Sequence, residues 1–253
     1  MTRRTAELAI LASLAAASCL ATGEGCSENG AAFEVASVKP LGTEAPMGVG
    51  RLLRLQLRPN LLEAKQATLK ALIGEAYHID QLQIVDGPNW LDRDRFNVTG
   101  KCGRQATREE FRAALRTLFA ERFALTTHRE TRVVPIYRML VAKDGPKFQP
   151  AQDEGPSSPA AFGHLRFRDL PSLCAVLSTF SDRVVVDETG LQGRFGLDVD
   201  ISGHMRQGAD HEKDDPFAVV LRETAQQLGV RFVGAKAPLE VLVVDRAERP
   251  SAN

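Results

Sequence analysis

The chain has 253 residues, and its 32 Lys and Arg residues balance its 32 Asp and Glu residues, which gives a pI near 7.0. This balance argues against a nucleic-acid partner or an anionic-lipid surface, because proteins of those classes carry a strongly basic face. With 43% hydrophobic residues the chain can form a packed core, and its length fits one large domain or two small ones.

Residues 1–21 have the features of a signal peptide. Two arginines near the start precede an uncharged apolar run at 8–20, and the small residues at 15–17 fit a cleavage site. The run of about 13 residues is too short for a spanning helix, which needs about 20. The protein is therefore expected to be exported to the periplasm or the medium. A membrane-tethered lipoprotein, modified at Cys19, is the alternative.

A tether and a first folded module are expected to follow. Residues 22–32 are rich in small and polar residues and are predicted to be flexible. The first module is predicted to span residues 33–148. It opens with two stretches that alternate apolar and polar side chains, at 33–38 and 53–57, and such alternation is typical of half-buried strands.

Two amphipathic helices are predicted in the first module. Thr68 can cap a helix whose apolar side chains recur at helical spacing as far as Tyr77. Thr107 and Glu110 form a capping box in front of a second helix that carries four apolar residues on one face. Strands are expected around these helices, at 94–98, 123–125 and 135–141.

A linker separates this module from a second one. Residues 149–160 belong to a stretch rich in Pro, Gly, Ser and Asp, which is typical of a connection between domains. The second module is predicted to span residues 161–253. Asp215 and Pro216 can open its second helix, and Gly229 can end it.

The two modules repeat the same order of elements. Three pairs of matching positions lie 101, 103 and 99 residues apart, respectively: Asp86 with Asp187, Pro135 with Pro238, and Phe96 with Phe195. A nearly constant offset of this kind indicates an internal repeat. The predicted fold is therefore α+β, built from two tandem small modules. Each module would have an antiparallel or mixed sheet with two helices on one face.

The cysteines leave two interpretations open. An oxidising compartment permits a disulfide, and Cys102 with Cys174 is the pair that we expect if one forms. Alternatively, Cys174 is a small core residue, because it lies on an apolar helical pattern. Cys26 would follow the cleavage site as an additional thiol.

Several segments resemble an uncharacterised bacterial family, the Solibacter C-terminal domain family. The resemblance extends over nearly everything after residue 32 and is carried by FEVASVKP at 33–40, VDGPNWLDRDRFNVTGK at 85–101, RVVVDETGLQGRFGLDVD at 183–200 and KAPLEVLVVDRAERPSAN at 236–253. It implies an exported protein and carries no known activity. Each module is also similar, in pattern only, to the short N-terminal docking domains of secretins and TonB-dependent receptors.

The sequence contains no complete catalytic motif of the kinds considered below. The segment 185–190 resembles an aspartic-protease loop, but Glu188 is inserted between the Asp and the Thr that such a loop needs. The chain has no GxSxG elbow, P-loop or GxGxxG motif. His204 and His211 lie in a loop rich in Asp and Glu and are the candidates for a metal site, although a solvated loop explains the same composition.

The leading hypothesis is a non-enzymatic cell-envelope or secreted protein-interaction module, without a cofactor and with an envelope protein as its partner. Trp90 is the candidate for partner binding, because aromatic side chains concentrate at interfaces, but packing in the core explains it as well. Two alternatives remain. One is a secreted hydrolase that uses a metal at His204 and His211, and the other is a protein that binds a small ligand between the two modules.

Overall fold

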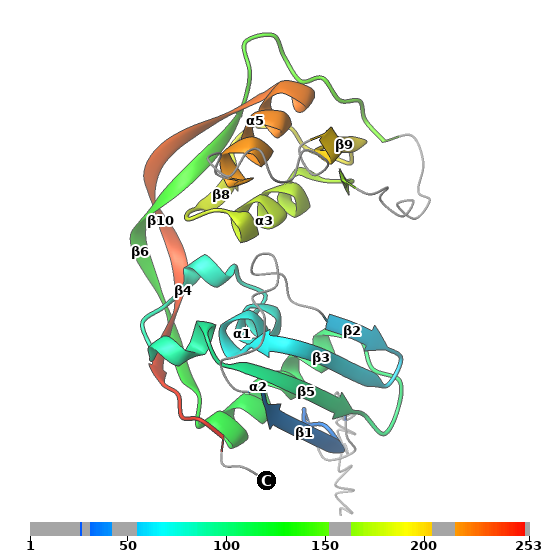
Figure 1. The fold of residues 1–253 in the computed structure, drawn as a ribbon, viewed down its shortest axis with the longest axis vertical. Helices are drawn as coiled ribbons and strands as arrows, with labels where there is room; N and C mark the ends of the chain where they lie inside the picture. Colours follow the sequence, from blue (N-terminus) through cyan, green and yellow to red (C-terminus); the bar gives the residue numbers. More distant parts are fainter. Residues whose placement is uncertain (1–25, 27–30, 42–54, 152–162, 204–215, 251–253) are drawn as a thin grey trace, which may run out of the picture.

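Two lobes are joined by a long two-stranded ribbon in the computed structural model (Figure 1). The structure describes Cys26 and residues 31–41, 55–151, 163–203 and 216–250. The α+β fold class predicted from the sequence is confirmed, with helices and mixed sheets in one chain. Among the helices of these segments, none combines the length and the apolar character that crossing a membrane requires.

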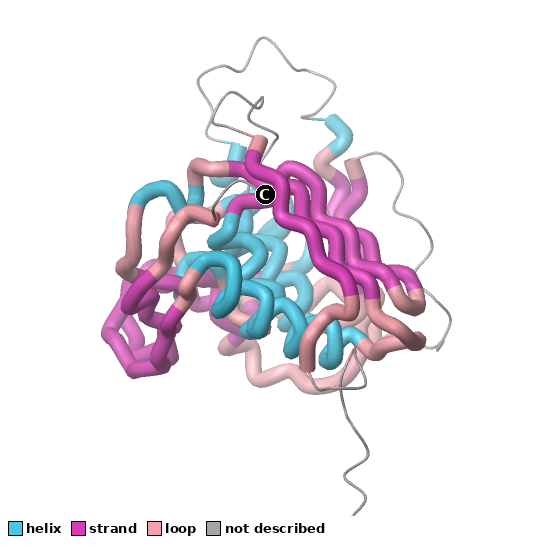
Figure 2. Tube along the Cα trace, turned by 90° about the horizontal axis from the view of Figure 1, so that it is seen from below, coloured by secondary structure: helices cyan, strands magenta, loops and turns pink. Residues whose placement is uncertain are grey.

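Lobe 1 contains a four-stranded antiparallel sheet and two helices. The strand order is β1-β5-β3-β2. Figure 2 shows the helices of this lobe in the middle, with strands on either side of them. The elements of the sheet and its helices are β1 (Val35–Pro40), β2 (Leu55–Arg58), β3 (Leu61–Thr68), β5 (Arg95–Lys101), α1 (Leu69–Tyr77) and α2 (Arg108–Phe123).

Local capping sets the starts of both helices, as the sequence predicts. The Thr68 hydroxyl accepts a hydrogen bond from the backbone N–H of Ala71 at the start of α1. Thr107 and Glu110 form the complete capping box at the start of α2. Two short 3-10 turns follow α1 in the chain, η1 (Gln81–Gln83) and η2 (Asn89–Asp92).

Lobe 2 is smaller. Strands β7 (His164–Phe167) and β9 (Leu197–Asp200) form an antiparallel pair, and helices α3 (Leu170–Phe180) and α5 (Pro216–Leu228) pack in the same lobe. Gly229 follows α5 with a φ of +65°, which confirms the predicted end of that helix. A Cβ atom at this glycine would lie 2.3 Å from a backbone oxygen, so the position requires glycine.

The ribbon consists of two strands that run through both lobes. Strands β6 (Thr126–Val141) and β10 (Val230–Arg246) pair antiparallel over nearly their whole length. Two short strands extend the ribbon into a sheet of order β4-β10-β6-β8, and both pair parallel to their neighbour. Strand β4 (Ile84–Val85) joins β10 in lobe 1, and β8 (Val184–Asp187) joins β6 in lobe 2.

The continuity of these strands corrects the sequence analysis. Separate strands were expected at 123–125 and 135–141, whereas one strand runs from Thr126 to Val141. Pro135 lies inside β6 and Pro238 inside β10, opposite Lys236 and Val133 respectively. A proline fits an antiparallel ladder where its nitrogen is not needed as a donor. Hydrogen-bonded and non-hydrogen-bonded residue pairs alternate along such a ladder. The pair of Pro135 with Lys236 and the pair of Pro238 with Val133 are two steps apart, so both can be non-hydrogen-bonded pairs.

Each end of the ribbon completes a different hydrophobic core. The core of lobe 1 includes Leu242 and Val244 from the last part of β10. The core of lobe 2 includes Met139 from the end of β6 and Val230 from the start of β10. Strand β10 therefore contributes to both cores.

The pairing of the ribbon is symmetric about its middle. Val134 lies opposite Ala237, and these two positions are 103 residues apart, as are Pro135 and Pro238. An internal repeat of that offset would produce this register. The division of the chain into modules at 33–148 and 161–253 remains a prediction from the sequence.

The disulfide joins Cys26 to Cys102, which corrects the expected pair of Cys102 with Cys174. Cys102 follows β5 in the core of lobe 1, whereas Cys174 lies on α3 in the core of lobe 2. The two residues belong to different cores, so they cannot reach bonding distance. The alternative interpretation of Cys174 as a small core residue is confirmed, because its thiol is free and buried.

The Cys174 thiol should be unreactive in the native protein. Burial raises its pKa to about 12, with a further contribution from the nearby Asp187 carboxylate, so almost no thiolate exists near neutral pH. In a chain without residues 1–21, we expect iodoacetamide to label no cysteine in the native state. In denaturant without a reductant it should label one. Rapid labelling of the native protein, measured by intact mass, would contradict the burial of this thiol.

Candidate functional site

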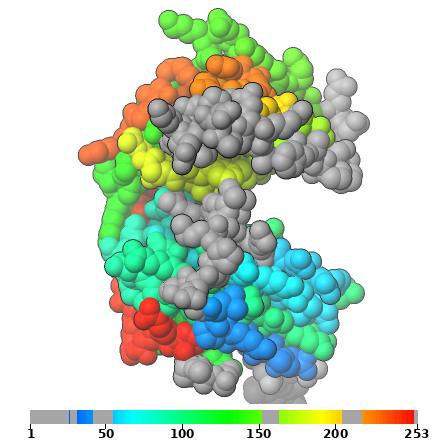
Figure 3. Space-filling model, viewed as in Figure 1, coloured from blue at the N-terminus to red at the C-terminus, as the bar shows by residue number. Residues whose placement is uncertain are grey.

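A cleft of about 770 Å³ lies between the two lobes. Figure 3 shows the hollow between them in space-filling form. Its lobe 1 wall comes from α1, the chain just after α1, and the start of α2, and its lobe 2 wall comes from α3 and β8. Leu239 of the ribbon also lines it. Clefts of this size at the boundary between two structural units are the usual places where proteins bind ligands.

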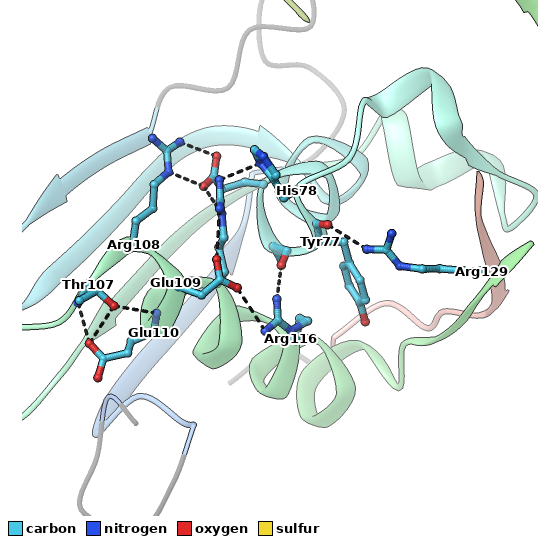
Figure 4. A network of polar contacts seen from close by, with 11 residues as sticks. Tyr77, His78, Thr107, Arg108, Glu109, Glu110, Arg116 and Arg129 are labelled. Atoms are coloured by element: carbon cyan, nitrogen blue, oxygen red, sulfur yellow. Dashed lines mark hydrogen bonds and ion pairs between the residues drawn. The ribbon is translucent and has the colours of Figure 1, made fainter. Parts of the chain in front are cut away.

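A carboxylate between two arginines dominates the lobe 1 wall (Figure 4). Nε and Nη2 of Arg108 donate to the two carboxylate oxygens of Glu75, at 2.9 and 2.8 Å. Nε of Arg112 donates to the same carboxylate, at 3.1 Å. The side chains of Glu75 and Arg112 are each only 14% exposed, so this contact is shielded from solvent and is stronger than a surface ion pair.

Arg112 also fixes the residue that ends α1. His78 adopts the left-handed conformation there, with a φ of +52°, and its Nδ1 lies 2.9 Å from Nη2 of Arg112. A guanidinium can only donate, so Nδ1 is the acceptor and the imidazole proton is on Nε2. Nη1 of Arg112 donates to Glu109 at 3.2 Å. All three nitrogens of Arg112 are therefore engaged.

Two further arginines bond the carbonyl end of α1. Nη1 of Arg116 donates to the Ala76 carbonyl at 2.6 Å, and Nη2 of Arg129 donates to the Tyr77 carbonyl at 3.1 Å. The last carbonyls of a helix have no partner within the helix and carry a partial negative charge, so cations are favourable there. These contacts tie the C-terminal end of α1 to α2 and β6, and they hold one wall of the cleft in place.

Glu75 should make the stability of the protein depend on pH. Burial raises the pKa of this carboxyl, but hydrogen bonds and charge from Arg108 and Arg112 outweigh burial, and the pKa is lowered below its ordinary 4.5. The stabilising contribution is therefore complete above pH 4.5 and is lost as the pH falls through the lowered pKa. We expect Glu75→Gln to reduce the free energy of unfolding by about 1–2 kcal/mol at neutral pH.

The control for this prediction is the pH profile itself. Urea unfolding of both proteins should show the difference between them shrinking below pH 4.5, because protonated Glu75 and glutamine are both uncharged. A difference that is the same at all pH values would show that the substitution acts through packing and not through the charge of Glu75.

The lobe 2 wall is mostly small and apolar. On α3 the residues that line the cleft include Pro171, Ser172 and Ala175, and all three are exposed. Every residue of β8 lines the cleft as well. Successive side chains of a strand point to opposite faces, so a cleft that touches four consecutive residues runs along the edge of the strand. In the sheet order, β8 is indeed an edge strand.

The hydroxyl of Ser178 is used to hold α3 against this edge. It donates to the Cys174 carbonyl at 2.9 Å and accepts from the Val185 N–H at 2.8 Å. A serine nucleophile needs a base within hydrogen-bonding reach, and the hydrogen of Ser178 is directed to a carbonyl instead. The described groups of the cleft place arginine donors on the lobe 1 wall and a mostly apolar surface on the lobe 2 wall, where Asp187 is the one carboxylate.

The candidate sites from the sequence lie elsewhere or outside the described residues. His204 and His211 belong to the segment that the structure leaves out, so their metal site stays a prediction. Within the described segments, no group of three or more His, Cys, Asp or Glu residues could hold a metal ion. In the protease-like segment, Asp187 accepts hydrogen bonds from the backbone and hydroxyl of Thr189, as expected for a strand that ends in a polar turn.

Trp90 packs against lobe 1. Its ring stacks on Phe123 at a centroid distance of 6.4 Å and meets the edge of Phe96. The guanidinium of Arg249 lies over the indole, 5.4 Å from its centroid, and also bonds Asp94. Trp90 therefore packs against other side chains of lobe 1. A role for it in partner binding stays a prediction.

Glu75, Arg108 and Arg112 are not among the site residues that the sequence predicts. Arg108 and Arg112 are four residues apart and therefore lie on one face of α2. Nothing in the sequence indicates that this face meets Glu75, because η1, β4, η2 and β5 lie between α1 and α2 in the chain. Only the packing of α1 against α2 brings the three residues together.

Comparison with known proteins gives one match. Residues 70–247 match the model of a family described as protein of unknown function, DUF3738. No curated protein and no solved structure matches the chain. The matched region runs from α1 to the end of β10 and includes lobe 2, the ribbon and the walls of the cleft, whereas β1, β2 and β3 of lobe 1 lie before it. Since it spans most of the sequence, the chain belongs to the DUF3738 family of proteins of unknown function.

Proposed function

We propose that the protein is an exported, non-catalytic binding protein that holds its ligand in the cleft between the two lobes. The cleft itself carries this proposal: about 770 Å³ of space has fixed guanidinium groups on one wall and small apolar residues on the other. Such a combination of apolar lining and a few oriented polar groups is typical of ligand sites. The family match does not supply an activity, so the proposal depends on this geometry.

The shape of the protein also supports binding. The two hydrophobic cores lie at opposite ends of the ribbon, and the cleft lies between them. A two-lobed protein of this kind can adjust the width of its cleft by bending or twisting the connection. A ligand that contacts both walls would hold the lobes at one separation.

Three observations support export. The N-terminal 21 residues have the pattern of a signal peptide, and the disulfide between Cys26 and Cys102 suits an oxidising compartment. The resemblance to the exported Solibacter C-terminal domain proteins agrees with both. Fractionation of a producing bacterium and intact mass of the isolated protein test this point, because cleavage leaves a shortened chain and lipidation at Cys19 adds the mass of a lipid.

Blocking the cleft should abolish binding. Ala175 is exposed on α3 and lines the cleft, so Ala175→Trp would fill the space with a large ring. Ala218, exposed on α5 in the same lobe and outside the cleft lining, provides the matched control Ala218→Trp. We expect ligands that raise the melting temperature of the wild type and of the control to have no effect on Ala175→Trp. Ligands that bind all three proteins equally would overturn the proposal.

The same pair of variants tests the protein-interaction hypothesis. Envelope extract can be passed over the immobilised wild type, Ala175→Trp and Ala218→Trp. A protein retained by the wild type and by Ala218→Trp alone would have its binding surface in the cleft. A protein retained equally by all three would dock elsewhere, and the cleft would then not be its site.

A further inference from the structure

Arg108 presents an unused side of its guanidinium in the cleft. A guanidinium has five N–H donors on a rigid plane, and it can bind one carboxylate through Nε and Nη2 and another through Nη1 and Nη2. Glu75 occupies Nε and Nη2. The opposite edge, formed by Nη1 and the second hydrogen of Nη2, is directed away from Glu75. The side chain is 59% exposed and lines the cleft, so this edge is accessible to a ligand.

The neighbouring groups hold Arg108 ready for a second anion. Arg112 shares the carboxylate of Glu75 but has its other nitrogens engaged by Glu109 and His78. Two further carboxylates line the cleft, and both already accept hydrogen bonds: Asp80 from the Leu82 N–H, and Asp187 from the N–H and hydroxyl of Thr189. Because Glu75 already fixes Arg108, an incoming carboxylate does not have to order a flexible side chain.

The opposite wall indicates the rest of the ligand. Pro171 and Ala175 present small apolar surfaces, and the valines of β8 lie along the same wall. The one carboxylate of the described residues on this wall, Asp187, would repel a second anionic group, and the apolar residues would not solvate one. An aliphatic body fits them, and Ser172 and Thr179 add two hydroxyls at the cleft.

We infer that the cleft binds an aliphatic carboxylate, with Arg108 as the residue that receives the carboxylate group. This inference rests on the proposed function and specifies its ligand class. The carboxylate can belong to a free branched-chain acid or to the C-terminus of a peptide that ends in an aliphatic residue, since both present the same group to Arg108.

Calorimetric titration of the full mature chain with matched probes tests the inference. The probes are 4-methylpentanoate and the tripeptide Ala-Ala-Leu, each compared with its amide, which keeps the shape and removes the charge. We expect at least one acid to bind and its amide to bind at least tenfold more weakly. Arg108→Gln should weaken binding of the acid by tenfold or more, and Arg108→Lys should not restore it fully, because lysine lacks the planar pair of donors.

The controls separate this inference from the proposed function. Arg246 is exposed, bonds Glu248 and lies outside the cleft lining, so Arg246→Gln should leave binding unchanged. Circular dichroism checks that Arg108→Gln is folded; Arg112, which also bonds Glu75, is unchanged in this variant. If the acid and its amide bind equally well, and Ala175→Trp abolishes the binding of both, the carboxylate inference is wrong. Binding in the cleft would still be supported. No binding of either acid would overturn the inference, whereas the proposed function would stand if other ligands raised the melting temperature of the wild type and not of Ala175→Trp.

Discussion

Leu177→Ala, a substitution in lobe 2, is expected to lower the denaturant midpoint of Trp90 fluorescence in lobe 1. Leu177 is fully buried in the core of lobe 2, and Trp90 is the only tryptophan in the sequence. Loss of a buried leucine side chain reduces the free energy of unfolding by about 2–5 kcal/mol. If the two lobes were independent, this loss would not affect a reporter in the other lobe.

The ribbon is the physical reason for this coupling. Strand β10 contributes buried side chains to both cores, and β6 pairs with it over nearly its whole length, so neither lobe keeps its core intact when the other unfolds. Unfolding of lobe 2 would release Val230 and Met139 and separate the strands next to them. Both lobes should then unfold in one cooperative transition.

Two probes check the coupling. Tryptophan fluorescence follows lobe 1, and circular dichroism follows all the helices. In urea the two curves should coincide for the wild type and shift together in Leu177→Ala. Ala218→Ser, on the exposed surface of α5, is the control that should leave the midpoint unchanged. Two separate transitions, with Trp90 unaffected by Leu177→Ala, would show that the ribbon does not couple the lobes.

Removing the disulfide is expected to destabilise the protein by about 4 kcal/mol. Cys26 and Cys102 are 76 residues apart, and closing a loop of that length restricts the unfolded chain by about that amount. The bond also fixes Cys26, a fully buried residue, to the end of β5. We expect the double variant Cys26→Ser, Cys102→Ser to have a lower urea midpoint than the wild type. A reductant should lower the midpoint of the wild type by a similar amount.

The double variant provides its own control. A reductant should leave its urea midpoint unchanged, because the described residues contain no other disulfide and Cys174 is free. Cys174→Ala in the wild-type background should keep the sensitivity to reductant. A wild type whose midpoint does not respond to reductant, under conditions where its two thiols are shown to be free, would contradict a stabilising role for this bond.

Some features of the protein follow from neighbouring residues and were predictable. Thr68 and the pair Thr107 and Glu110 start their helices because each side chain reaches a backbone N–H only three residues away. Gly229 ends α5 in the left-handed conformation, and a side chain there would collide with the backbone of Gly145. The α+β class follows from the same patterns, since helical and strand periodicities are local.

Other features depend on residues far apart in the sequence. The sequence predicts that a strand begins at Pro135, and only the pairing of β6 with β10 shows that this proline and Pro238 lie inside continuous strands. The partner of Cys102 depends on which core each cysteine joins, which the spacing of cysteines does not reveal. The candidate site depends on the packing of α1 against α2, which places Glu75 between Arg108 and Arg112.

The amino-acid sequence by itself determined the helix starts, the α+β class, the balanced charge and the signal-peptide pattern, because each of these depends on composition or on residues within a few positions of one another. The tertiary structure decided the shared ribbon, the disulfide, the two cores and the cleft. These arise from contacts between segments that are distant in the sequence, and local propensity contains no information about which distant segments will meet.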